Sequence, residues 1–287
     1  AAPAPPAPGR AAAPPRAAAS QAGAVAIVPA VAAPGVDLDA LRTDGERALR
    51  IVCLVFTVLI YLALVAWILG IIYFGILVLM GWIALAMRMC HVRGNGVRAG
   101  LDQLPHVHES ARRAARSLGL EGVPDVYVIQ EGGILNAFAA KWAFRRYVVV
   151  YADLVDACGD GSAELDMVVA HEMGHLALGH ITWQWILLPS MFVPFLSQAY
   201  SRACEYSSDR CGWTACRDKQ AAVRGLVILA AGGQCGRMAS IEAFLRQRQE
   251  TEGFWQTVIE LFSTHPWLTR RAEAMQQLAA GGSGGAA

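Results

Sequence analysis

The sequence predicts an α+β fold, in which a mostly helical domain with a small antiparallel sheet follows a transmembrane helical hairpin. Three observations support this. No charged residue occurs between positions 51 and 87. Short segments rich in β-branched and aromatic residues follow between positions 123 and 151, separated by turn signals. A helical pattern then carries the pentad His-Glu-Met-Gly-His at 171–175.

The uncharged segment, taken as 51–88, is too long for one simple span. As a single helix it would measure roughly 55 Å, whereas the hydrocarbon core of a bilayer is about 30 Å thick. Two spans joined near Gly70 or Gly75 fit better, with a tilted single span or a re-entrant loop as alternatives. Arginines flank both ends, and the positive-inside rule then places both ends in the cytoplasm. They are Arg42, Arg47, Arg50, Arg88, Arg93 and Arg98.

Composition divides the rest of the chain. Residues 1–36 are almost wholly small or Pro, which predicts a disordered tail, and 279–287 predict a second flexible tail. Residues 37–50 form a juxtamembrane segment. The residues from 100 to 278 suffice for one domain with its own core.

Within that domain, a helix is predicted over Leu104–Leu118, followed by strands over 123–130, 134–140 and 146–151. Short turns separate the strands, so we expect an antiparallel meander.

A second apolar stretch covers 181–200. Its prolines, Pro189 and Pro194, argue against a plain spanning helix. We expect this membrane-proximal segment to dip into the bilayer interface with its Trp side chains at headgroup depth. The alternative is an ordinary hairpin within the protein core.

The pentad has the spacing of a metal site. Residues four apart share one face of a helix, so His171 and His175 can bind one ion with Glu172 beside it. A structural zinc site is closed by four protein ligands, usually including closely spaced cysteines, whereas a catalytic site keeps one position for water. The chain has no Cys-x-x-Cys pair. This favours an open, catalytic site.

A third ligand must come from elsewhere, and Glu205 and Asp209 stand four residues apart on a later helix. We assign Glu205 to the metal. Asp209 would accept the free ring N–H of a ligand histidine, preferably His171, and so fix its tautomer. The alternative is that the two carboxylates lie on a solvated helix face.

His180 does not fit the pattern of a third histidine ligand. That pattern, HExxHxxGxxH, requires His one position later. We interpret His180 as a residue at a helix C-terminus, where the helix dipole favours a cation.

At these residues the chain resembles the HtpX-like membrane gluzincins, which include the CAAX prenyl proteases. The resemblance spans roughly 100–275. It includes AHEMGH at 170–175, Glu205 with Asp209, Asn-Ala-Phe-Ala at 136–139, and His265-Pro266 with Arg271. Ser208 departs from the Ala that is usual there.

The resemblance implies a zincin-like catalytic domain, with the HExxH helix under the sheet. It implies one zinc ion, held by His171, His175 and Glu205, and Glu172 as the base that activates water. Asn136 would position substrate backbone. His265 or Arg271 would share the charge that develops on the scissile carbonyl oxygen. For His265 a packing role beside Pro266 is the alternative.

Composition excludes some functions. The net charge is +1 and no basic run occurs, which does not support nucleic-acid binding. The seven cysteines are odd in number and scattered, as is typical of reduced thiols in a cytoplasmic domain. They are Cys53, Cys90, Cys158, Cys204, Cys211, Cys216 and Cys235.

We therefore predict an integral membrane zinc endopeptidase of a bacterial inner membrane. Its catalytic domain would face the cytoplasm and cut unfolded or misfolded membrane polypeptides. Two alternatives stay open: a processing protease for one membrane or lipidated substrate, and a catalytically idle zinc-bound scaffold. The presence of Glu172 favours an enzyme over the scaffold. The sequence defines no oligomeric state.

Overall fold

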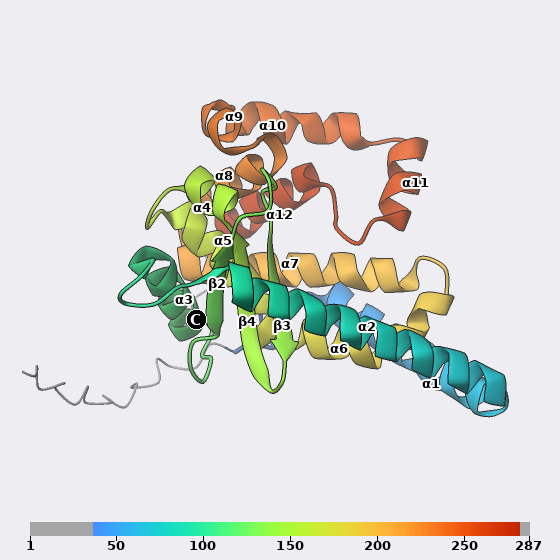
Figure 1. Ribbon diagram of the computed structural model, residues 1–287. Coiled ribbons are helices and arrows are strands. Elements are labelled where there is room, and N and C mark those ends of the chain that lie inside the picture. Colours follow the sequence, from blue (N-terminus) through green and yellow to red (C-terminus); the bar gives the residue numbers. More distant parts are fainter. Residues whose placement is uncertain (1–36, 282–287) are drawn as a thin grey trace, which may run out of the picture. The chain divides into compact units, whose positions relative to one another are not determined.

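The structure is a computed structural model that describes residues 37–281 (Figure 1). The predicted tail at 1–36 and the end of the predicted tail at 279–287 therefore lie outside the described residues. The described part of the predicted catalytic domain contains one large hydrophobic core, to which residues from Ala99 to Met275 contribute.

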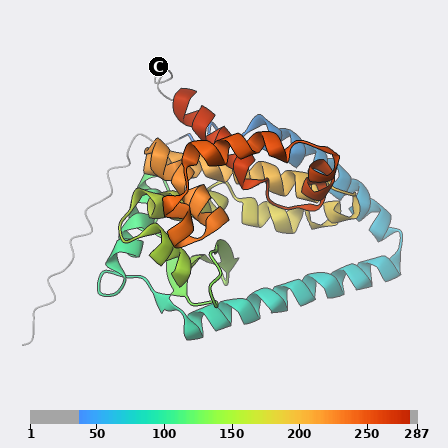
Figure 2. The same ribbon diagram turned by 90° about the horizontal axis from the view of Figure 1, so that it is seen from above.

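Two long apolar helices come first, α1 (Asp44–Val65) and α2 (Ile68–Asn95). By length and composition these two described helices could each cross a membrane. They diverge from a turn at Ala66 and Trp67 (Figure 2). Two helices were expected to join near Gly70 or Gly75, and the turn falls three residues before Gly70, while the chain is helical through both glycines. The break between the helices comes at Trp67, whose backbone is extended. Neither Gly nor Pro stands at this position to predict it.

The sheet is mixed, with strand order β1-β2-β4-β3. Its strands are β1 (Val97–Arg98), β2 (Asp125–Ile129), β3 (Ala137–Trp142) and β4 (Arg145–Tyr151). β3 and β4 form the expected antiparallel hairpin, but β4 pairs with β2 in parallel. The predicted meander was therefore wrong. The connection between β2 and β3 is long enough for the chain to leave a gap, and β4 fills that gap.

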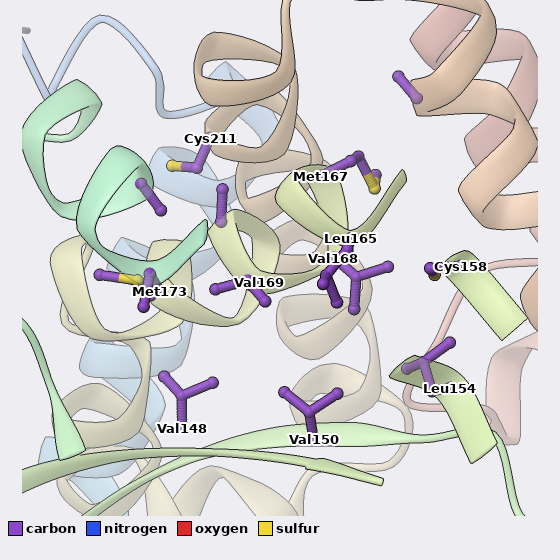
Figure 3. Packing of buried hydrophobic residues seen from close by; sticks show 14 of the residues in the cluster. Val148, Val150, Leu154, Cys158, Leu165, Met167, Val168, Val169, Met173 and Cys211 are labelled. Atoms are coloured by element: carbon purple, nitrogen blue, oxygen red, sulfur yellow. The ribbon is translucent and has the colours of Figure 1, made fainter. Parts of the chain in front are cut away.

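The central position suits β4 because both of its faces are buried. Val148 and Val150 point toward α5 (Ala163–Ala177), where Val168 and Val169 face them (Figure 3). The alternate residues of β4 form separate clusters with the other face of the sheet and with α2. The sheet thus lies between the pentad helix and the second apolar helix.

The pentad helix α5 is fixed at both ends. Its N-cap is Ser162, whose hydroxyl accepts a hydrogen bond from the backbone N–H of Leu165 at 3.1 Å. Its last turn gives way to Gly179, whose φ of 74° suits glycine. Helix α3 (Pro105–Ser117) packs against α5. It confirms the helix predicted at Leu104–Leu118. A short helix α4 (Ala152–Cys158) joins β4 to α5.

The segment 181–200 folds into α6 (His180–Ile186), the 3-10 helix η1 (Leu188–Phe192) and the start of α7 (Leu196–Cys216). Its burial is mixed. Leu187 is buried, whereas Trp185, Met191 and Phe192 are exposed. Entry of this segment into a bilayer stays a prediction.

The remaining helices follow α7 in the chain and complete the domain. They are α8 (Lys219–Ala231), α9 (Gly233–Met238), α10 (Ile241–Arg246), η2 (Gln247–Thr251), α11 (Phe254–Phe262) and α12 (Leu268–Gly281). Helix α12 packs against both α7 and α8. This packing brings residues from the end of the chain to the pentad.

Helices α5 and α7 are in close contact at Gly174, inside the pentad. A Cβ atom there would lie 2.8 Å from Cβ of Cys211 and 3.2 Å from Cα of Ser208. Atoms of a neighbouring helix cannot yield easily in a packed core. Gly174 is thus required by packing.

We predict that Gly174→Ala lowers the free energy of unfolding by about 1–3 kcal/mol, because the added methyl overpacks the α5–α7 contact. Thermal unfolding in detergent measures this. The matched control is Gly94→Ala in α2, where a Cβ meets nothing within 4 Å. The control should leave stability unchanged or raise it slightly. Equal effects of the two changes would contradict the packing argument.

Candidate metal centre

Helices α5 and α7 bring three metal-ligating side chains together. Nε2 of His171 lies 3.4 Å from Oε2 of Glu205, and Nε2 of His175 lies 3.5 Å from Oε1 of the same carboxylate. One ligand atom from each of the three residues lies within 4.8 Å of the other two. At ligand distances of about 2.0–2.2 Å, one ion can reach all three atoms. The donor set therefore suits a single divalent metal.

Asp209 lies one turn beyond Glu205 on α7 and faces His171. Its Oδ1 is 2.9 Å from Nδ1 of His171. The nitrogen that faces away from Glu205 thus has a carboxylate partner, as metal-binding histidines commonly do. The structure brings these two residues together, and the role of Asp209 in orienting a metal ligand stays a prediction.

Arg271 of α12 lies behind both carboxylates. It donates to Asp209 through Nε at 2.9 Å and Nη2 at 2.6 Å, and its Nη1 is 2.9 Å from Oε2 of Glu205. Burial alone would raise the pKa of Glu205, but the charge of Arg271 and the bond to His171 hold it well below its usual value. The expected role of Arg271 was contact with substrate. Its guanidinium compensates two buried negative charges. Arg271 also lines the cleft, so contact with substrate stays a prediction.

Glu172 is half-buried on the floor of a cleft of about 240 Å³. The cleft opens beside β3, an edge strand, and Ala139 of that strand lines it together with Glu172. Burial raises the pKa of Glu172 to about 7, and the negative charge of Glu205 adds to the effect while His171 opposes it. A carboxylate with a pKa near neutrality can both accept and return a proton.

His265 and Asn136 also line this cleft. His265 precedes α12, its side chain is 66% exposed, and its Nε2 is 3.5 Å from Oε1 of Glu205. It is therefore exposed at the site, although Pro266 beside it is buried. Asn136 is exposed at the start of β3, and its side-chain oxygen accepts from the N–H of Ala137 at 2.9 Å.

His180 lies elsewhere than expected. It begins α6 instead of ending α5, because Gly179 ends the first helix and starts the second. Its side chain is fully buried, and its Nδ1 is 3.1 Å from Nδ1 of His175. The prediction that His180 lies at a helix C-terminus was wrong.

Sequence reasoning missed Glu46. This residue lies in the first turn of α1, is fully buried, and has Oε1 3.3 Å from Nε2 of His180. Thr43 caps that turn, and its hydroxyl accepts from the N–H of Glu46. The pattern Thr-x-x-Glu at 43–46 is a capping-box signal that could have marked the start of the helix. Nothing in it indicates a carboxylate close to the metal ligands.

A cluster of three ligands with a carboxylate beside it, at a cleft along a sheet edge, is the arrangement of a metallopeptidase. The chain belongs to peptidase family M48, which matches residues 102–193 and 183–279. The family indicated by the sequence motifs is thus confirmed.

A relative in Arabidopsis thaliana is the plastoglobule-localized metallopeptidase 48, chloroplastic. The two are 29% identical over 204 residues, which cover 64% of this chain and 55% of that protein. The chain therefore spans about half the length of this relative.

We predict that Asp209→Asn weakens metal binding by about 10- to 100-fold, because His171 loses the carboxylate that orients it. Equilibrium competition with a chelator measures the affinity. The matched control is Asp166→Asn on α5, which removes a carboxylate paired with Arg113 at 2.6 Å and leaves the metal ligands untouched. An Asp209→Asn protein that binds metal as tightly as the control would contradict the orienting role.

Proposed function

We propose that this protein is an integral membrane endopeptidase that uses zinc to hydrolyse peptide bonds in unfolded or misfolded polypeptides. The observation that carries the proposal is the position of Glu172. It lies next to the His171, His175 and Glu205 cluster, in a cleft that the edge strand β3 also lines. The proposal assigns the domain to the zincin-like class, with α5 under the sheet.

Zinc is the metal we propose because two imidazoles and one carboxylate, with a position left for water, form a common catalytic zinc set. Bound there, zinc would supply the Lewis acidity that polarises a scissile carbonyl and makes water a nucleophile at neutral pH. His171, His175 and Glu205 would hold it.

The protein's own groups then handle the protons. Glu172 takes a proton from the attacking water and returns it to the leaving nitrogen as the C–N bond breaks. His265, which is exposed at the cleft, donates to the carbonyl oxygen as negative charge develops there. Both groups lie on the same side of the ligand cluster as the cleft, where a substrate can reach them.

Substrate binding along β3 would favour extended chains. An edge strand offers unpaired N–H and C=O groups, to which an extended peptide can add itself as a further strand. Ala137, Phe138 and Ala139 of β3 line the cleft. Main-chain recognition tolerates many sequences, which suits unfolded substrates. Asn136 would help to position the backbone of the substrate at the start of this strand.

The membrane proposal rests on α1 and α2. Their apolar side chains are largely exposed to the surroundings, for example Leu62, Val65 and Ile68 at 65–75%. A soluble protein rarely exposes so large a contiguous apolar surface. Antiparallel spans joined by a short turn place both of their outer ends on one side of the membrane.

We predict that Glu172→Gln abolishes casein cleavage, with a loss of about 10²–10⁴-fold in rate, because no base remains to take the proton of water. Metal content should stay at the wild-type level. Glu164→Gln in the first turn of the same helix serves as the control and should cleave like the wild type. If neither wild type nor variant cleaves although metal is bound, the broad protease fails and a processing enzyme or a scaffold replaces it.

Topology is tested by cysteine labelling in sealed vesicles, starting from a Cys90→Ser/Cys235→Ser protein. We predict that Asp39→Cys and Arg93→Cys react with a membrane-impermeant maleimide from the same side. Trp67→Cys, at the turn, should react only from the other side. Labels on opposite sides for positions 39 and 93 would contradict the hairpin.

A further inference from the structure

The two ligand histidines are oriented by different partners. His171 turns its Nδ1 to the carboxylate of Asp209, whereas His175 turns its Nδ1 to another imidazole, that of His180, at 3.1 Å. His180 is fully buried at the start of α6. A histidine paired with a second histidine is an unusual way to satisfy a ligand's free N–H, which commonly meets a carboxylate, a carbonyl or water.

The position of each proton follows from the geometry. When His175 binds metal through Nε2, its Nδ1 carries the proton and must donate it. Nδ1 of His180 is then the acceptor, so the proton of a neutral His180 stands on Nε2. That atom lies 3.3 Å from Oε1 of Glu46. Neither this nitrogen nor Oε2 of Glu46 has a hydrogen-bond partner among residues 37–281, so the carboxylate of Glu46 meets His180 as a close polar contact.

Glu46 is itself held in place. Nη1 of Arg42 lies 2.6 Å from the same Oε1, and Nη2 of Arg42 donates to the carbonyl of Leu178 at 2.7 Å. Leu178 follows directly after α5, the helix that carries His175. The first turn of α1 is thereby joined to the end of the pentad helix. The carboxylate of Glu46, held by Arg42, is thus the last group in the series of contacts that starts at His175 and passes through His180.

A second metal ion on the same residues is the competing interpretation. Glu46, His180 and Cys204 are buried and close enough to share an ion. However, a metal on Nε2 of His180 would move the proton of that ring to Nδ1. Two N–H groups would then face each other across 3.1 Å whenever His175 binds metal. When metal is bound at His171, His175 and Glu205, only a metal-free His180 lets its Nδ1 accept the hydrogen bond from Nδ1–H of His175.

We propose that His180 and Glu46 are positioning residues for His175, so that the first turn of the apolar helix α1 is a working part of the metal centre. The inference rests on the proposed metal site at His171, His175 and Glu205. Glu46 acts through His180, and His180 fixes the tautomer and ring orientation of His175. The membrane hairpin then contributes to metal affinity as well as to anchoring.

The test measures metal affinity of the full-length protein in detergent by chelator competition, using zinc, and follows the visible spectrum after cobalt substitution. His180→Phe keeps a ring but removes the acceptor, and should weaken zinc binding by about 10- to 100-fold. His180→Asn places an oxygen near the position of Nδ1 and should restore most of the affinity and the wild-type cobalt spectrum. A role in packing alone would favour Phe over Asn.

A double-mutant cycle tests Glu46. Glu46→Met should weaken zinc binding several-fold in the wild-type background and have no further effect when His180 is already Phe, because Glu46 then has nothing to orient. The same should hold with His180→Asn, which keeps the cycle usable if the Phe variant does not fold. Asp166→Asn is the control for loss of a carboxylate outside this chain of contacts.

Unchanged affinity in His180→Phe, or an equal loss from Glu46→Met with and without His180, would overturn the proposal. Thermal unfolding of the metal-free proteins separates loss of affinity from loss of fold. The readout is binding, so it does not depend on cleavage. A wild type that binds zinc tightly but cuts no casein would refute the protease while leaving this inference in place.

Discussion

The close contact between α5 and α7 is the constraint on which the site depends. Gly174 lets the two helices approach until backbone and Cβ atoms of α7 touch α5. At this separation the histidines on one helix and the carboxylates on the other are within reach of one ion. Side chains have little freedom to correct an error in helix spacing, because a zinc ligand must be placed to within a few tenths of an ångström.

The same contact creates an electrostatic problem, which α12 solves. Glu205 and Asp209 are both buried, and two carboxylates away from water are costly unless they are paired. Arg271 contacts both. Its position explains why a residue so late in the chain matters to a motif at 171–175. It also explains why the domain needs its C-terminal helices although they contribute no ligand.

The sequence predicted those features that depend on local periodicity. His171 and His175, and likewise Glu205 and Asp209, stand four residues apart, so each pair shares a face of its helix whatever the rest of the fold does. Arg271 was identified as a site residue, but its partners were not, because they depend on how α12 packs against α7. The sheet order was missed because strand pairing is decided by long-range burial, and β4 is the strand with two buried faces.

Glu46 and His180 show the limit most clearly. Glu46 and His180 stand 134 positions apart in the chain, so no sequence spacing predicts that their side chains meet. They meet because α1 packs against α7 and η1, next to the end of α5. Sequence spacing can place residues on one helix face, but it cannot place two helices side by side.

The central claim is that one metal ion is held by two imidazoles and one carboxylate between α5 and α7. X-ray absorption spectroscopy of the zinc-loaded protein tests it most directly. We predict a first coordination shell made only of nitrogen and oxygen at about 2.0–2.2 Å, with two imidazole contributions. A sulfur ligand at about 2.3 Å would contradict the account. It would place the ion with buried Cys204, next to Glu46 and His180, instead of in the open cleft.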